Sequence, residues 1–156
     1  MGMGYGRLHN QTGKGMIVRD AIFEDLEQLM PIAHEVHKQS IFADTPMNEA
    51  QIQRVFVLSM NFHDGFAKVV EHKGKVVGCM FGVVVDNHFG IRCAQDLFTF
   101  SRGGTNTLIK EFKTWAIERG AQFVQISDLS GRDRYHRLIK EMGFMPQGAN
   151  FIYMEA

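Results

Sequence analysis

Hydrophobic and polar positions repeat with two different periods along this chain, which predicts a domain built from both strands and helices. Residues 17–22 alternate with a period of two, as in a half-buried strand. Residues 23–40 place hydrophobic side chains three and four positions apart and begin with the acids Glu24, Asp25 and Glu27, which favours a helix. Pro31 is expected to kink that helix or to break it after its first turns.

The rest of the chain continues this mixed pattern, with turn residues between the segments. Asn48 is predicted to cap a second helix that extends to about Phe62. The later elements predicted in the same way are a β-hairpin (65–72 and 75–85) turning at Lys73 and Gly74, a strand (91–100), a helix (106–119) ending at Gly120, a buried strand (121–126), a helix ending at Gly143, and one or two last strands (144–154). The pattern predicts a single α+β domain over residues 16–156.

Residues 1–15 precede this domain and contain five glycines with almost no aliphatic side chains. Such a segment has too little apolar surface to order itself, so we expect a flexible N-terminal tail.

Composition and charge narrow the functional classes. With 156 residues, of which 45% are hydrophobic, the chain can bury a sizeable core. Its 17 basic and 17 acidic side chains balance, so no overall field favours nucleic acid or an anionic membrane, and any anion site must be local. No apolar run is long enough to span a bilayer and no signal-peptide core is present, so we expect a cytoplasmic protein.

The cysteines and histidines do not have the spacing of a metal site. Cys79 and Cys93 lie inside strand-like runs and are interpreted as buried free thiols. His34 and His37, on the first helix, form no metal-binding motif, so no metal is expected.

The most informative segment is residues 96–112, where a strand breaks at Gly103 and Gly104 and a helix follows. Glycines let the backbone approach an anion, and the first N–H groups of a helix are unpaired and carry partial positive charge, to which Arg102 adds. The segment therefore favours a phosphate site, although Gly-Gly after a strand also occurs as a plain turn.

The order of elements from residue 16 onward resembles the GCN5-related N-acetyltransferase (GNAT) family. Four local phrases carry the resemblance: EHKGKVVG (71–78), QDLF (95–98), KTWAIERG (113–120) and MGF (142–144). The resemblance implies the acyl-CoA N-acyltransferase fold, a mixed central sheet flanked by helices whose fourth and fifth strands splay apart. Acetyl-CoA is then expected in the gap, with the coenzyme bound by Leu97, Phe98, Thr99, Phe100, Ser101, Arg102, Gly103, Gly104, Thr105 and Asn106.

Two departures from the family pattern concern these same regions. The family loop carries a basic residue, a middle glycine and a final small residue. Placing Gly103 at the middle glycine puts Phe100 at the basic position, whereas placing Arg102 at the basic position puts Thr105 at the glycine. The tyrosine that the family carries four residues before the last helix's closing glycine is replaced by Ile139.

Acetyl transfer to an amine needs a base for the amine and an acid for the leaving thiolate. Asp96 is the first candidate for the base; its alternatives are exposure to solvent or pairing with Arg92. Asp128 could orient the amine or cap the next helix, and Glu71 is expected to be solvated. Tyr135 and His136 are the candidate acids, with a packing tyrosine and a surface histidine as the alternative.

The function implied is an acetyl-CoA-dependent N-acyltransferase that acetylates a primary amine by direct attack in a ternary complex. The acceptor is expected to be a small molecule or peptide amine, with Phe42, Met47 and Phe62 as candidates for its pocket. The resemblance also makes a homodimer plausible. Two alternatives stay open: a degenerate GNAT-like binding or assembly protein that retains CoA, and an interaction domain whose Gly-Gly is only a turn.

Overall fold

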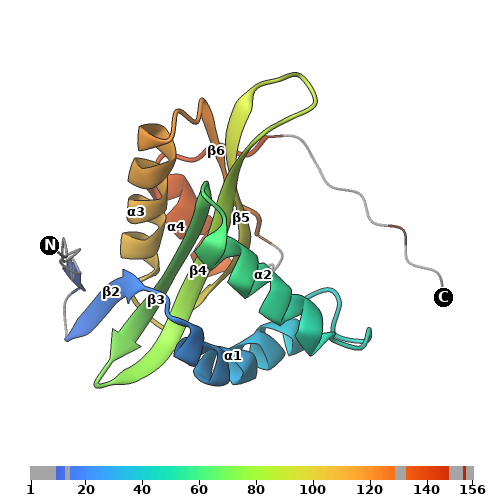
Figure 1. The fold of residues 1–156 in the computed structure, drawn as a ribbon, viewed down its shortest axis with the longest axis vertical. Coiled ribbons are helices and arrows are strands. Elements are labelled where there is room, and N and C mark those ends of the chain that lie inside the picture. The colour runs from blue at the N-terminus through green and yellow to red at the C-terminus, as the bar shows by residue number, and fades with distance from the viewer. Residues whose placement is uncertain (1–9, 13–14, 129–132, 148–152, 154–156) are drawn as a thin grey trace, which may run out of the picture.

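Six strands form one mixed sheet through the middle of the molecule (Figure 1). The computed structural model describes residues 10–12, 15–128, 133–147 and 153. Its strands, which neighbour one another in chain order, are β1 (Asn10–Thr12), β2 (Met16–Asp20), β3 (Gly65–His72), β4 (Lys75–Asp86), β5 (Arg92–Ser101) and β6 (Phe123–Gln125). Neighbours are antiparallel except β5 and β6, which run parallel and are joined through a helix. The α+β class is therefore confirmed.

Helices cover both faces of this sheet (Figure 1). They are a 3-10 turn (Phe23–Asp25), α1 (Leu26–Lys38), α2 (Glu49–Asn61), α3 (Thr105–Glu118) and α4 (Asp133–Glu141). On one face, α1 and α2 bury Leu29, Ile32 and Phe56 against the sheet. On the other face, α3 buries Leu108 and Phe112. The sheet thus separates two cores, as expected for a domain with helices on both sides. None of the described helices is long and apolar enough to cross a membrane.

Local sequence signals account for most element boundaries. The side chain of Asn48 accepts a hydrogen bond of 3.1 Å from the Gln51 N–H, so it caps α2 as predicted. The β3–β4 hairpin turns at Lys73 and Gly74, which both have positive φ, as a two-residue hairpin turn requires. Gly120, at φ 79°, follows α3 as predicted.

Two predictions about elements need correction, and a third is only partly tested. α1 continues through Pro31 without a break, because loss of one backbone hydrogen bond costs less than burial of Leu29, Ile32 and Ala33 gains. β6 is three residues long and not buried: among the described strands it pairs with β5 alone, and its Phe123 is 58% exposed. The one or two strands expected over residues 144–154 are not tested as a whole: the described residues there (144–147 and 153) lie in no strand, and the others are outside the described residues, so that expectation stays a prediction.

The predicted N-terminal tail contains one element that the sequence did not indicate. Asn10–Thr12 form β1 and pair with β2. The remainder of the tail before Gly15 lies outside the described residues, so its flexibility stays a prediction.

β5 carries one irregularity that matters for the site. Phe81 of β4 pairs with Phe98, but the next residue, Gly82, pairs with Asp96, so Leu97 is an extra residue in β5. A residue inserted in this way is a β-bulge, which bends a strand and changes which side its later side chains face. As a result, Phe98 and Phe100 pack on the α1–α2 face.

Candidate active site

The sheet opens between β5 and β6. The two strands pair only from Cys93 to Gln95, where Gln95 opposes Gln125. Beyond that point the Ser127 N–H donates to Asp96 Oδ1 at 2.8 Å, and among the described residues β5 continues to Ser101 with no strand beside it on this edge. Counted from β2, these are the fourth and fifth strands of the domain, so the predicted splay is present. It leaves backbone groups of residues 96–101 available to a ligand.

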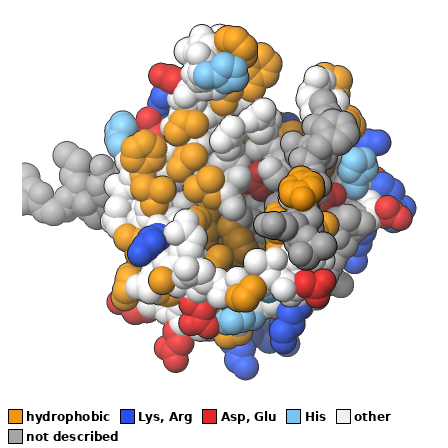
Figure 2. Space-filling view, turned by 90° about the vertical axis from the view of Figure 1, so that its right-hand side faces the viewer, with side chains coloured by type: hydrophobic (Ala, Val, Ile, Leu, Met, Phe, Trp, Pro, Cys, Tyr) orange, Lys and Arg blue, Asp and Glu red, His pale blue; other side chains and the backbone are white. Residues whose placement is uncertain are grey.

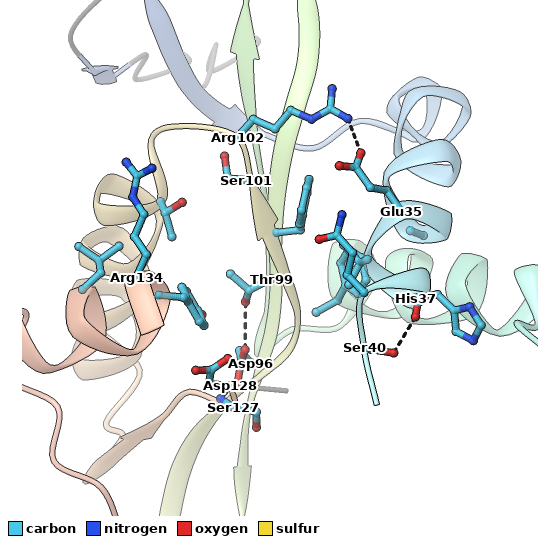
Figure 3. Close-up of a pocket in the computed structure, with 18 of the residues that line it drawn as sticks. Glu35, His37, Ser40, Asp96, Thr99, Ser101, Arg102, Ser127, Asp128 and Arg134 are labelled. Carbon is cyan, nitrogen blue, oxygen red and sulfur yellow. Dashed lines mark hydrogen bonds and ion pairs between the residues drawn. The ribbon is translucent and has the colours of Figure 1, made fainter. Parts of the chain in front are cut away.

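A cavity of about 1020 Å³ occupies this opening. Its walls come from α1, the loop after α1, β5, the loop before α3, and α4 (Figure 3). The space-filling view in Figure 2 shows this face hollowed, with hydrophobic side chains in its depth. All ten residues predicted to contact the coenzyme line the cavity: Leu97, Phe98, Thr99, Phe100, Ser101, Arg102, Gly103, Gly104, Thr105 and Asn106.

The loop before α3 has the backbone features of an anion site. Gly104 caps α3 in the left-handed conformation, with φ 71°, which favours glycine. No acidic residue lies in the first turn of α3, and among the described residues no hydrogen-bond acceptor faces the N–H groups of Thr105 and Asn106. A Cβ on Gly103 would lie 2.4 Å from Cε of Met16, so a larger residue there would displace that side chain. These N–H groups can therefore donate hydrogen bonds to an anion.

Arg102 is tied to the opposite wall of the cavity. Its guanidinium forms an ion pair with Glu35 of α1, across the end of β5 (Figure 3). The Ser101 hydroxyl donates to the carbonyl of Gly103 within the same loop. The cation nearest the expected phosphate position is thus paired with a carboxylate that the sequence analysis did not consider.

Asp96 lies at the point where the strands part. Its Oδ1 accepts from the Ser127 N–H at 2.8 Å, and its Oδ2 accepts from the Thr99 hydroxyl at 3.0 Å (Figure 3). Burial raises the pKa of this carboxyl above its ordinary value, against the opposing effect of the two hydrogen bonds. Neither alternative in the sequence analysis holds, because Arg92 instead pairs with Asp64 at 2.7 Å and Asp96 faces the cavity.

Tyr135 also lines the cavity, and its hydroxyl is buried. No described residue lies in hydrogen-bonding geometry to this hydroxyl, although the Thr99 hydroxyl is close enough to oppose the rise of its pKa. Burial, followed by the nearby charges of Asp96 and Asp128, raises the pKa of this phenol above its ordinary value. Tyr135 thus presents a protonated donor beside the candidate base.

Of the other polar candidates, only Asp128 lines the cavity. His136 is exposed and does not line the cavity; its Nδ1 is 3.9 Å from Oδ2 of Asp128. Asp128 does line the cavity, next to Ser127. Glu71, expected to be solvated, instead accepts a hydrogen bond of 2.9 Å from Arg19. Among the described residues, no group of three or more His, Cys, Asp and Glu side chains is arranged to hold a metal ion.

The acceptor candidates divide in the same way. Phe42 and Met47 line the cavity from the loop between α1 and α2, whereas Phe62 ends α2 and is not among the lining residues.

Sequence reasoning missed Glu35, Ser127, Arg134, Arg137 and Leu138. The spacing of Arg134 and Arg137, three apart on a helix, was a signal that could have placed both on the face turned to the cavity.

Solved structures of acetyltransferases resemble this chain over most of its length. An aminoglycoside acetyltransferase from an uncultured soil metagenomic sample has a TM-score of 0.67 and 16% identity, and the match covers 94% of this chain and 100% of that one. A ribosomal-protein-alanine N-acetyltransferase from Brucella melitensis biovar Abortus 2308 has a TM-score of 0.66 and 13% identity, covering 90% and 99%. A glucosamine-6-phosphate N-acetyltransferase from Arabidopsis thaliana has a TM-score of 0.66 and 11% identity, covering 89% and 97%.

The sequence itself matches no protein-family model and no curated protein. The structural matches nevertheless cover nearly the whole of both chains, so they extend over the sheet and the helices on both of its faces. The chain has the GNAT fold that the local phrases and the order of elements predicted.

Proposed function

We propose that this protein is an acetyl-CoA-dependent N-acyltransferase that acetylates a primary amine by direct attack within a ternary complex. The observation that supports this best is that the open edge of β5 leads directly into the N-terminus of α3. Both border one cavity. An extended chain with amide groups can pair with such an edge, and a diphosphate can bind at such a helix terminus.

The residues present suit that donor. The pantetheine arm offers amides for the unpaired edge over residues 96–101, and the diphosphate suits the N–H groups of Thr105 and Asn106 together with Arg102. Arg134 and Arg137 add positive charge from α4 on the same side of the cavity. When bound, acetyl-CoA supplies the acyl group as an activated thioester.

Two side chains of this chain can move the protons. Asp96, whose oxygens are held by Ser127 and Thr99, takes the proton from the attacking amine. Tyr135 keeps its proton at neutral pH, because the ordinary pKa of a phenol is about 10 and burial raises it further, and its hydroxyl gives that proton to the departing thiolate. Tyr135 thus takes the role that Ile139 cannot fill, and His136, outside the cavity, has no part in it.

Calorimetry with acetyl-CoA, followed by a thiol-release assay over a panel of amines, tests the proposal. We expect saturable binding, and thiol release that depends on the amine. Asp96→Asn should lower kcat by about a hundredfold while leaving acetyl-CoA affinity within about twofold, because the residue acts on the amine. Unchanged turnover in this variant would remove Asp96 from the role, and absence of acetyl-CoA binding would refute the proposal.

The second candidate function is a binding or assembly protein that holds CoA without turnover. The ion pair of Arg102 with Glu35 and the isoleucine at position 139 favour it. Heat of binding without thiol release from any amine would support this alternative over the enzyme.

A further inference from the structure

One side of the cavity is mainly apolar. It is formed by α1, the following loop and α2, and it lies apart from the side expected to bind the coenzyme. Its main contributors, which we call the apolar wall, are Val36, Phe42, Met47, Ile52 and the inward-facing Phe98 of β5. Gln39 and Ser40 add only neutral polar groups. Phe42 is 38% exposed, so this wall offers apolar surface to a ligand rather than being closed off by packing.

The charges in the cavity lie at other places. Asp96 and Asp128 are together at the splay, where the reacting amine would lie under the proposed function. Arg134, Arg137 and Glu141 are on α4, across β5 from the wall. Among described residues, α1 contributes one carboxylate to the lining, Glu35, which lies beside Arg102 at the other end of β5 from Asp96 (Figure 3). His37 of α1 points its ring away from β5 (Figure 3).

We infer that the acceptor is a primary monoamine with an uncharged, apolar alkyl or aryl body, rather than a diamine, polyamine or aminoglycoside. One ammonium group can lie beside Asp96 and lose its proton there. A second ammonium group along the same molecule would rest against the apolar wall without a counter-charge, and that desolvation is unfavourable. The apolar body of a monoamine gains free energy from the same contact. The inference rests on the proposed function.

The test compares amines of equal length that differ by one charge. The probes are hexylamine and 1,6-diaminohexane, with 2-phenylethylamine and a polyamino sugar as further members, each assayed by thiol release from acetyl-CoA. We expect kcat/KM for hexylamine to exceed that for the diamine by about tenfold or more, since burying an unpaired charge costs at least as much as losing a hydrogen bond. An equal or higher value for the diamine or the polyamino sugar would overturn the inference.

A charge placed on the wall should reverse this preference. Met47→Glu is expected to raise the diamine-to-hexylamine ratio of kcat/KM by about tenfold, because the new carboxylate pairs with the second ammonium. Met145→Glu, at a position that is 76% exposed and outside the cavity, is the matched control and should leave the ratio unchanged. If Met47→Glu also leaves the ratio unchanged, the wall does not contact the acceptor and the inference fails.

Removal of apolar surface gives a second readout. Phe42→Ala should raise KM for hexylamine several-fold with CoA affinity unchanged, whereas Ile41→Ala, one residue earlier and outside the cavity lining, should not. Failure of the wild-type protein to bind acetyl-CoA would refute the proposed function and the inference together. Binding and turnover with a reversed preference would refute the inference alone, and binding without turnover of any probe would refute it while leaving a CoA-binding protein.

Discussion

Asp96 is a carboxylate held where its charged form is unfavourable. Burial raises its pKa, and hydrogen bonds from Ser127 and Thr99 only partly offset this effect. A raised pKa suits a base, because a proton taken from an ammonium group is then held more readily. It should also shift the acidic limb of the pH–rate profile above the value for an exposed aspartate, about 3.9.

The same shift predicts how stability depends on pH. Because the folded-state pKa of Asp96 lies above its unfolded value, its stabilising contribution is complete below the unfolded pKa and is lost as pH rises through the folded pKa. Asp96→Asn removes this loss while its amide oxygen can still accept a hydrogen bond. The melting temperature of the variant relative to wild type should therefore increase between about pH 4 and pH 7. A difference that stays constant over this range would contradict the prediction.

Tyr135→Phe separates a catalytic hydroxyl from a packing ring. The ring remains, and the lost hydroxyl is buried without a partner among the described residues, so stability should be unchanged or slightly higher. Turnover should fall by about 10- to 100-fold with acetyl-CoA affinity retained, since the proton donor is lost. Tyr153→Phe, at a position 88% exposed, is the control. Full activity in Tyr135→Phe would assign the residue to packing alone.

Sequence could identify Asp96 and Tyr135 as titratable groups near the expected site, but not their surroundings. Ser127, which positions Asp96, lies 31 residues away in the chain. From the sequence, His136 is as suitable a proton donor as Tyr135. Only the rotation of α4 about its axis decides that His136 is exposed and that Tyr135 lines the cavity. Such rotation is fixed by packing, which single-sequence patterns do not record.

At the scale of elements, the site depends on how β5, the glycine loop and α3 follow one another. The ion pair between Arg102 and Glu35 joins this unit to α1. Both side chains are partly exposed, so the pair itself contributes little to stability. The pair matters because the Glu35 carboxylate and a bound diphosphate would compete for the Arg102 guanidinium.

Glu35→Gln should therefore tighten CoA binding, by about threefold to tenfold at low salt, since Arg102 no longer leaves a carboxylate to meet the phosphates. Isothermal titration of CoA into the two proteins measures this. Glu27→Gln removes the same charge from an exposed position on α1 outside the cavity and controls for net charge. A weaker or unchanged affinity in Glu35→Gln, relative to that control, would show that Glu35 does not compete.

Element order was predictable because each helix and hairpin carries local signals such as the Asn48 cap and the turn at Gly74. Predictions failed where tertiary context decides. The run 121–126 is apolar enough for a buried strand, yet within the described part of the chain β6 has a neighbouring strand on one side only. Pro31 is unfavourable locally, and the packing of α1 overrides that penalty.

At the scale of the whole molecule, both thiols are enclosed: Cys79 lies in the core beneath α1 and α2, and Cys93 is buried in β5. Cys79 and Cys93 are buried, and burial raises the pKa of the Cys79 thiol. A thiol in this environment is a poor nucleophile as well as an inaccessible one. Neither residue should therefore interfere with an assay that follows thiol release.

Labelling with a disulfide reagent tests this arrangement. In the native protein both thiols should react orders of magnitude more slowly than in denaturant, and acetyl-CoA should slow them further if it stabilises the fold. Met145→Cys, which introduces an exposed thiol, provides the fast reference. Rapid modification of two native thiols would mean that the cores open far more readily than their burial indicates.

Because Leu97 is an additional residue in β5, this one strand can present proton-transfer groups on one side and hydrophobic groups on the other. In a regular strand Asp96 and Thr99, three positions apart, would project to opposite sides, yet here Thr99 donates to Asp96. The additional residue reverses the alternation of side chains after it. Asp96 and Thr99 therefore face α4, whereas Phe98 and Phe100 face α1 and α2. If β5 kept Leu97 but paired regularly without the bulge, Phe98 and Phe100 would face the same side as Asp96, and proton-transfer groups would be mixed with the hydrophobic lining.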